Sequence, residues 1–388
     1  MLHPVATVDR MGYKAFPVVV SGAGRHWTVL DENYRLEPLA DAFLTYLRYG
    51  RGRAESTTKA YAGALAVFLG WRETKGLDLL SGARNMHRFV AELRLTPIPV
   101  GRRSAGRPRS PQRVNGVMAA VNEFYKWAAS NGHVDVSALS SLYEAPTQRW
   151  IGEPVARRAY PQPRARYRLA VVTNGRPRVA TEEELAGLLR TCIHWRDRFL
   201  VIVLRYTGLR IGQALGLRHS DVHFLESSAE LGCQISGPHL HVVSRTNPNR
   251  AANKSRRGYA VPVIAEVVWA YENYLAERDE CRQAADSDFV FVNLFSEPRG
   301  APMKLHAAQE LFERLSKRGG LTRTVRPHML RHSMATAVME GGAHIDVVRE
   351  LLGHSSISST LIYSHASDQR MRDAVEAEAR HRRGNREG

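Results

Sequence analysis

The sequence predicts a mainly α-helical protein of two domains, with a small antiparallel β-sheet inside the second. Three observations predict this. A length of 388 residues exceeds what one ordinary core accommodates. Apolar residues recur at helical spacing over about 34–140 and again from about 182, where short strand-like runs interrupt the helices. A stretch rich in proline and arginine, 145–179, separates the two parts.

The first domain is predicted to be wholly helical over residues 34–144. Residues 1–33 are expected to form an N-terminal arm or small extension, with one strand-like run from Phe16 to Val20. In the helical part, Ser56 or Thr57 suits an N-cap, and the chain breaks near Gly132. Four helices are predicted, at about 36–50, 56–73, 85–93 and 111–130.

Residues 145–179 are predicted to form an extended basic linker, because they combine many prolines with little periodicity. The second domain, 180–366, opens on a capping box formed by Thr181 and Glu184. A charged tail helix, 367–388, follows it. The expected strands lie at about 229–235, 239–244 and 258–264, and the expected helices at about 182–193, 195–206, a short one near 210, 265–280, 304–318, 327–340, 344–352 and 356–364.

The composition excludes several classes of protein. An apolar fraction of 44% is enough for real cores, so a disordered basic tail is excluded. No run of about 18 apolar residues exists, so neither a spanning helix nor a membrane partner is expected. Three cysteines, Cys192, Cys233 and Cys281, stand far apart without a CxxC pair. That spacing argues against a disulfide scaffold or a cysteine-rich zinc site, and favours a reducing compartment.

The charge points to a polyanionic partner. The 55 basic residues outnumber the 38 acidic ones, a formal charge of +17. Basic residues cluster in segments without acids, as expected where a chain lies against a phosphate backbone; solvated basic loops are the alternative. The candidate DNA-binding residues are Arg102, Arg103, Arg107, Arg109, Arg113, Arg164, Arg166, Arg168, Arg256 and Arg257.

Three segments carry residues suited to phosphoryl transfer: TGLRIGQALGLRHSDV (207–222), NKSRRGYAVPV (253–263), and 328–365, which contains HMLRHS and LLGHSSISSTLIYSH. In order and spacing they resemble the tyrosine recombinase (phage integrase) family. The family's pattern maps onto Arg210, Lys254, His328, Arg331, His354 and Tyr363. The resemblance implies a DNA-breaking and rejoining architecture, with a helical core-binding domain and a mixed α/β catalytic domain.

The residue types suit that chemistry. A phenol has a pKa of about 10, so Tyr363 needs cationic neighbours to act as a nucleophile. Two arginines can hold the non-bridging oxygens of a phosphate bidentately. His328 and Arg331 are three positions apart and share a helix face, and Pro327 suits the first turn of that helix. Neither a metal nor another cofactor is expected, because cationic side chains stabilise the developing charge.

The resemblance implies the remaining roles. Lys254 would be the general acid for the departing 5′ oxygen, His354 would hydrogen-bond the phosphate, and His328 would exchange the proton of Tyr363. One position departs from the family: many members have an acidic residue where Gln213 stands, and an amide is expected to hold Arg210 less firmly. We also expect His332 to lie on another face in a structural role, and the polar segment 244–254 to be flexible.

The predicted function is site-specific recombination or integration of DNA through a 3′-phosphotyrosine intermediate. The alternatives are DNA relaxation of the type IB topoisomerase kind, and DNA binding without catalysis. The expected partners are double-stranded DNA and further copies of the chain, as a tetramer on DNA; accessory DNA-bending or directionality proteins are also compatible with the family. The expected location is the bacterial cytosol and nucleoid.

Overall fold

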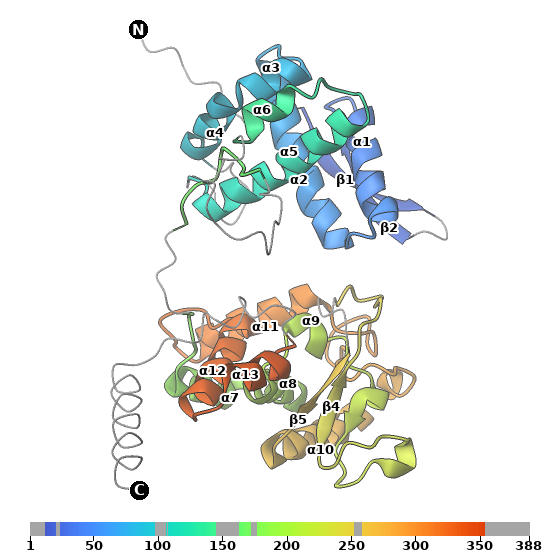
Figure 1. Ribbon diagram of the computed structural model, residues 1–388. Helices are drawn as coiled ribbons and strands as arrows, with labels where there is room; N and C mark the ends of the chain where they lie inside the picture. The colour runs from blue at the N-terminus through green and yellow to red at the C-terminus, as the bar shows by residue number, and fades with distance from the viewer. Residues whose placement is uncertain are drawn as a thin grey trace, which may run out of the picture. The chain divides into compact units, whose positions relative to one another are not determined.

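The computed structural model divides into two compact units, residues 1–172 and 173–388 (Figure 1). The residues it describes are 12–20, 24–97, 106, 108–144, 163–171, 177–251 and 258–353. Helices dominate both units and each contains one small antiparallel sheet, which confirms the predicted fold class. None of the helices in these ranges has the length and hydropathy that a membrane span requires.

The first unit is a helical bundle with a β-hairpin on one side. The predicted strand at Phe16 is present and pairs with a second strand that the periodicity did not reveal. The helix predicted over 36–50 ends in a π-helical turn, and two short helices were not predicted. The elements are β1 Lys14–Val20, β2 Gly24–Leu30, α1 Pro38–Thr45, η1 Tyr46–Gly50, α2 Glu55–Thr74, α3 Leu79–Arg84, α4 Met86–Leu95, α5 Pro111–Ser130 and α6 Ala138–Leu142.

Aromatic side chains fill the core between α1, α2, α4 and α5. Phe68 of α2 meets Phe89 of α4 edge to face, with ring centroids 5.3 Å apart, and Phe43 of α1 meets Phe124 of α5 at 5.5 Å. The hairpin joins this core because Val29 of β2 is fully buried and both strands pack on α2. Residues 12–30, apart from the undescribed 21–23, are therefore part of the first unit's fold.

Part of the expected linker packs on the first unit. Residues 163–171 run back along it: Glu144 donates its N–H to the carbonyl of Arg164, and Arg166 donates its N–H to that of Leu142, each at 2.9 Å. The side chain of Asn115 on α5 pairs with both the N–H and the carbonyl of Leu169 at 2.9 Å. These bonds give the backbone of this extended segment partners that a free linker would take from water.

The second unit surrounds a three-stranded sheet with helices. The capping box predicted at Thr181 is present, because Thr181 accepts from the N–H of Glu184 and Glu184 accepts from that of Thr181. The elements are α7 Glu182–Thr191, α8 Trp195–Thr207, α9 Ile211–Ala214, η2 His219–Asp221, β3 Val222–His223, η3 Ala229–Leu231, β4 His239–Val242, β5 Tyr259–Pro262, α10 Ala265–Asp279, η4 Arg282–Ala284, α11 Leu305–Arg318, α12 Pro327–Glu340 and α13 Ile345–Leu351.

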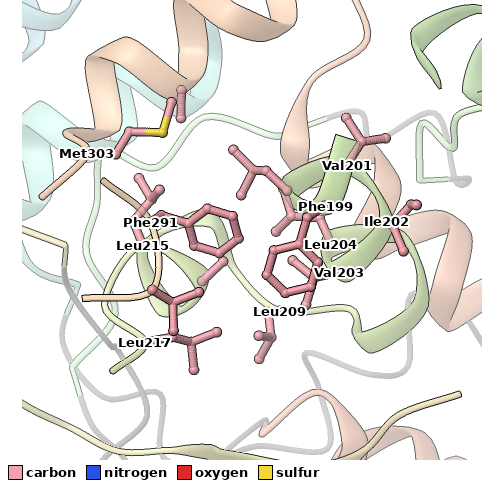
Figure 2. Close-up of a cluster of buried hydrophobic side chains, with 14 of the residues drawn as sticks. Phe199, Val201, Ile202, Val203, Leu204, Leu209, Leu215, Leu217, Phe291 and Met303 are labelled. Carbon is pink, nitrogen blue, oxygen red and sulfur yellow. The ribbon is translucent and has the colours of Figure 1, made fainter. Parts of the chain in front are cut away.

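Helix α8 is the centre of this unit and packs against both α10 and α12 (Figure 1). Its apolar residues are buried on nearly every side, as expected for a helix surrounded by protein. Figure 2 shows Phe199 of α8 facing Phe291, with Leu215 and Leu217 beside them. The two phenylalanine rings are stacked, with centroids 5.2 Å apart. This packing joins α8 to the core of the second unit.

The sheet has the order β3-β4-β5 and is antiparallel throughout. His223 lies opposite His239, and Leu240 lies opposite Val261. The expected strand over 229–235 is wrong: that segment contains the 3-10 turn η3, and a single bridge between Ser227 and Ser236 closes it into a loop. Gly232, with φ of 74°, ends the turn in a conformation that no strand contains.

Candidate active site

Arg331 is an almost fully buried cation, with 1% of its surface exposed. It lies on α12, whose first residue is Pro327 as predicted. Its Nη1 donates to the carbonyl of Gly208 at 2.5 Å, and its Nη2 donates to the carbonyl of Leu352 at 2.8 Å. This guanidinium therefore joins the end of α8 to the end of α13, and its position is set by three helices.

Arg210 lies three residues beyond Thr207, the last residue of α8. Gly208 ends that helix with φ of 64°, and a Cβ there would come within 3.0 Å of Leu352 and Met334. Arg210 is half-buried, and its Nη1 is buried with no hydrogen-bond partner in the described part of the chain. A buried N–H without a partner costs free energy, so an anionic oxygen would be a favourable ligand for it.

Gln213 holds the backbone of Arg210 from the first turn of α9. Its Oε1 accepts from the N–H of Arg210 at 2.8 Å, and its Nε2 donates to the hydroxyl of Tyr259 at 3.1 Å. The side chain is 3% exposed. Because both ends of the amide are used, this position is well ordered without an acidic residue.

Tyr259 is a member of the site that sequence reasoning missed. Besides the bond from Gln213, its hydroxyl donates to the carbonyl of Leu352 at 3.5 Å. Burial raises the pKa of Tyr259, while the positive charges of Arg331 and Arg210 act in the opposite direction. One phenol thus lies near both arginines. The available signal was its place as the aromatic residue of the segment 253–263.

Gly353 allows Tyr259 to occupy this place. Gly353 has φ of 58°, and a Cβ built on it would lie 2.4 and 2.5 Å from ring atoms of Tyr259. Any side chain at this position would have to displace the ring. The glycine therefore allows the chain after α13 to pass directly over the tyrosine.

His328 and His332 meet edge to face at the start of α12. Their ring centroids are 4.3 Å apart, with planes inclined by 72°. The expectation that His332 lies on another face is wrong, because residues four apart on a helix are neighbours on one face. Burial, then His328 and Arg331, lower the pKa of His332 from 6.5 to about 4. His332 is therefore neutral at pH 7. The side chain of His328 is exposed to solvent.

Three predicted catalytic residues, Lys254, His354 and Tyr363, lie outside the described residues. The segment leading to Lys254 was expected to be flexible, and up to Ala251 this is wrong. Arg245 pairs bidentately with Asp221 at 2.6 and 2.7 Å, and buried Asn249 donates to the carbonyls of Leu215 and Met303. Side-chain bonds replace a hairpin here, which the polar composition alone did not reveal.

The predicted DNA-binding arginines fall into different environments. Arg164, Arg166 and Arg168 are exposed and alternate with half-buried residues, so they share one side of an extended segment. Arg113 is exposed at the start of α5. Arg109 donates to the carbonyl of Thr96 at 3.0 Å and so helps to cap the end of α4. The remaining candidates lie outside the described residues, namely Arg102, Arg103, Arg107, Arg256 and Arg257.

Comparison with known proteins identifies the class. Residues 178–370 match the model of the phage integrase family. Tyrosine recombinase XerD of Corynebacterium glutamicum is 27% identical over 342 residues, which cover 86% of this chain and 95% of that protein. Transposase A from transposon Tn554 of Staphylococcus aureus is 26% identical over 354 residues, covering 89% and 92%.

Solved structures share the fold. The Tn1549 transposon integrase, in complex with transposon right end DNA, matches with a TM-score of 0.57 at 18% identity, covering 88% of this chain and 99% of that one. The XerH site-specific recombinase, bound to a palindromic difH substrate, matches with a TM-score of 0.53 at 18% identity, covering 87% and 88%. The chain belongs to the tyrosine recombinase (phage integrase) family, as the motifs predicted.

Proposed function

We propose that this protein is a site-specific DNA recombinase whose nucleophile is Tyr363. The phenolic oxygen attacks a DNA phosphorus, a 3′-phosphotyrosine bond forms, and the 5′ oxygen leaves as a hydroxyl after taking a proton. A 5′ hydroxyl of a partner strand then reverses the step. The bond energy is kept in the covalent link, so no nucleotide hydrolysis is needed.

The observation that carries this proposal is the meeting of two arginines distant in sequence. Arg331 reaches the carbonyl of Gly208, 123 residues away, and Arg210 follows that glycine with a buried Nη1 that has no hydrogen-bond partner in the described ranges. Two arginines beside the end of α8 suit the oxygens of one phosphate, whose charge grows during attack. His328 is exposed on the first turn of α12, and in this proposal it exchanges the proton of Tyr363.

The remaining roles follow the family's pattern. Lys254 protonates the leaving oxygen and His354 hydrogen-bonds the phosphate. Double-stranded DNA lies against the exposed row Arg164, Arg166 and Arg168, together with the basic residues of the segment 101–113. The active assembly is a tetramer on two DNA sites, working in the bacterial cytosol at the nucleoid.

The nucleophile can be tested with nicked, suicide-type DNA substrates taken from the flanks of the protein's own locus. Wild type should form a covalent protein–DNA band, and Tyr363→Phe should abolish it. Tyr206→Phe is the matched control, because Tyr206 lies in the same unit with an exposed ring, and it should retain the band. An unchanged band in Tyr363→Phe refutes the assignment. Relaxation of supercoiled DNA with no exchange between two sites would refute the recombinase function.

A further inference from the structure

Three histidines share one face of the small sheet. His223 of β3 lies opposite His239 of β4 in the antiparallel register, and His241 lies two residues further along β4. Successive strand residues point to opposite faces, so Leu240, between the two histidines of β4, is directed into the core and is fully buried. The imidazoles therefore gather on the face away from the core, where their ring centroids are 4.5 to 5.0 Å apart.

A cysteine from the loop between β3 and β4 completes the group. The turn η3 and Gly232 bring Cys233 back over the sheet. Its Sγ lies 3.3 Å from Nε2 of His239 and 3.4 Å from Nε2 of His241, and those two nitrogens are 3.1 Å apart. One ligand atom from each of the four residues, His223 included, lies within 4.8 Å of all the others.

These separations suit one tetrahedral ion. With zinc–sulfur bonds of about 2.3 Å and zinc–nitrogen bonds of about 2.0–2.1 Å, ligand atoms at tetrahedral angles are about 3.3–3.6 Å apart. The three separations among Cys233, His239 and His241, 3.1 to 3.4 Å, lie close to that range. A slight expansion of the cluster would place an ion at its centre.

The hydrogen bonding of His239 orients it as a metal ligand. Its Nδ1 is 2.7 Å from the carbonyl of Gly237, which can only accept, so Nδ1 carries the proton. In the neutral imidazole, Nε2 then carries no proton, and its lone pair is available to a metal ion. This nitrogen faces Cys233 and His241. A second bond to a backbone carbonyl is the usual outer support of a metal-bound histidine. His223, 8% exposed, has a buried Nδ1 without a hydrogen-bond partner within the described ranges.

We propose that His223, Cys233, His239 and His241 bind one Zn²⁺ in a structural site. A thiolate with three imidazoles is a donor set that zinc prefers, and four protein ligands leave no open position for catalysis on the metal. The ion joins the loop 224–238 to the sheet. Since β4 pairs with β5, which begins at Tyr259, zinc also stabilises the strand that carries this tyrosine into the active site.

Metal analysis of the full-length protein, purified without chelator, tests the site. Wild type should contain about one zinc per chain, and Cys233→Ser and His241→Ala should each contain almost none. Cys281→Ser is the matched control, because Cys281 is half-buried in the same unit and is not part of the cluster; it should keep its zinc. A chelator should lower the Tm of wild type, and added Zn²⁺ should restore it.

Cobalt provides a readout that does not depend on the folding of a variant. Wild type reconstituted with Co²⁺ should show a thiolate-to-cobalt charge-transfer band and the intense visible bands of tetrahedral Co²⁺, and Cys281→Ser should show the same spectrum. The proposal is overturned if wild type binds neither Zn²⁺ nor Co²⁺, if the bound cobalt lacks the thiolate band, or if Cys281→Ser loses the metal as fully as Cys233→Ser.

Discussion

Replacing Gly353 with alanine should damage the active site more than an equivalent change elsewhere. The backbone there has φ of 58°, and forcing a Cβ into the left-handed region costs about 1–2 kcal/mol. The new Cβ would also lie 2.4 Å from the ring of Tyr259, well inside van der Waals contact. Overpacking of this kind adds about 1–3 kcal/mol. Gly353→Ala should therefore lower the free energy of unfolding by about 2–5 kcal/mol.

Gly320→Ala provides the control. Gly320 lies in the same unit with φ of 63°, and a Cβ there would meet nothing within 4 Å. The left-handed cost and the gain from a less flexible unfolded chain are common to both variants, so they cancel in the comparison. Urea denaturation of the two full-length variants should differ by the overpacking contribution alone, about 1–3 kcal/mol.

The variants Gly353→Ala and Gly320→Ala also test whether the position of Tyr259 affects DNA cleavage. Tyr259 bonds to Gln213 and lies near Arg331, so a displaced ring should slow formation of the covalent protein–DNA band at least about tenfold, or about 1.4 kcal/mol in the barrier. Gly320→Ala should form the band at the wild-type rate. If both variants lose equal stability and cleave equally well, the contact between residue 353 and Tyr259 does not order the site.

Substitutions at two further positions, Gln213 and His332, test the neighbours of the arginines. Gln213→Leu removes both the acceptor for the N–H of Arg210 and the donor to the hydroxyl of Tyr259, and should cost about 1–3 kcal/mol in urea denaturation. Gln213→Glu keeps the acceptor for Arg210 and loses only the donor, so it should cost less. For His332, a pKa lowered to about 4 means that the unfolded chain binds the extra proton between about pH 6.5 and 4. Stability should fall as the pH drops through that window, and His332→Gln should flatten the slope; an unchanged slope contradicts a neutral, buried imidazole.

Local patterns in the sequence were enough to predict many of the helices and strands. The period of 3.6 residues predicted the helix over 111–130 with its bounds, and the capping box at Thr181 marked the start of α7. The alternation in HLHVVS predicted β4. Such signals need only neighbouring residues, because helix caps and strand faces are decided within a few positions.

Other features required contacts between distant residues. The apolar residues of 229–235 were compatible with a strand, but a bridge from Ser227 to Ser236 makes the segment a loop. Tyr259 joins the site only because β5 brings it beside Gln213 and the end of α13. Neither contact follows a regular spacing along the chain, so neither could be predicted from the sequence.

By itself, the sequence predicted the family and its activity on DNA, and it singled out Arg210, His328 and Arg331 as candidate catalytic residues, because these residues stand in motifs whose spacing can be counted along the chain. Only the tertiary structure decided that Arg331 caps the carbonyl of Gly208, that Tyr259 lies near both arginines, and that Cys233 meets three histidines. The physical reason is that strand register and helix packing set distances between residues far apart in the chain. These distances depend on which surfaces are buried together, and a local sequence pattern does not indicate that.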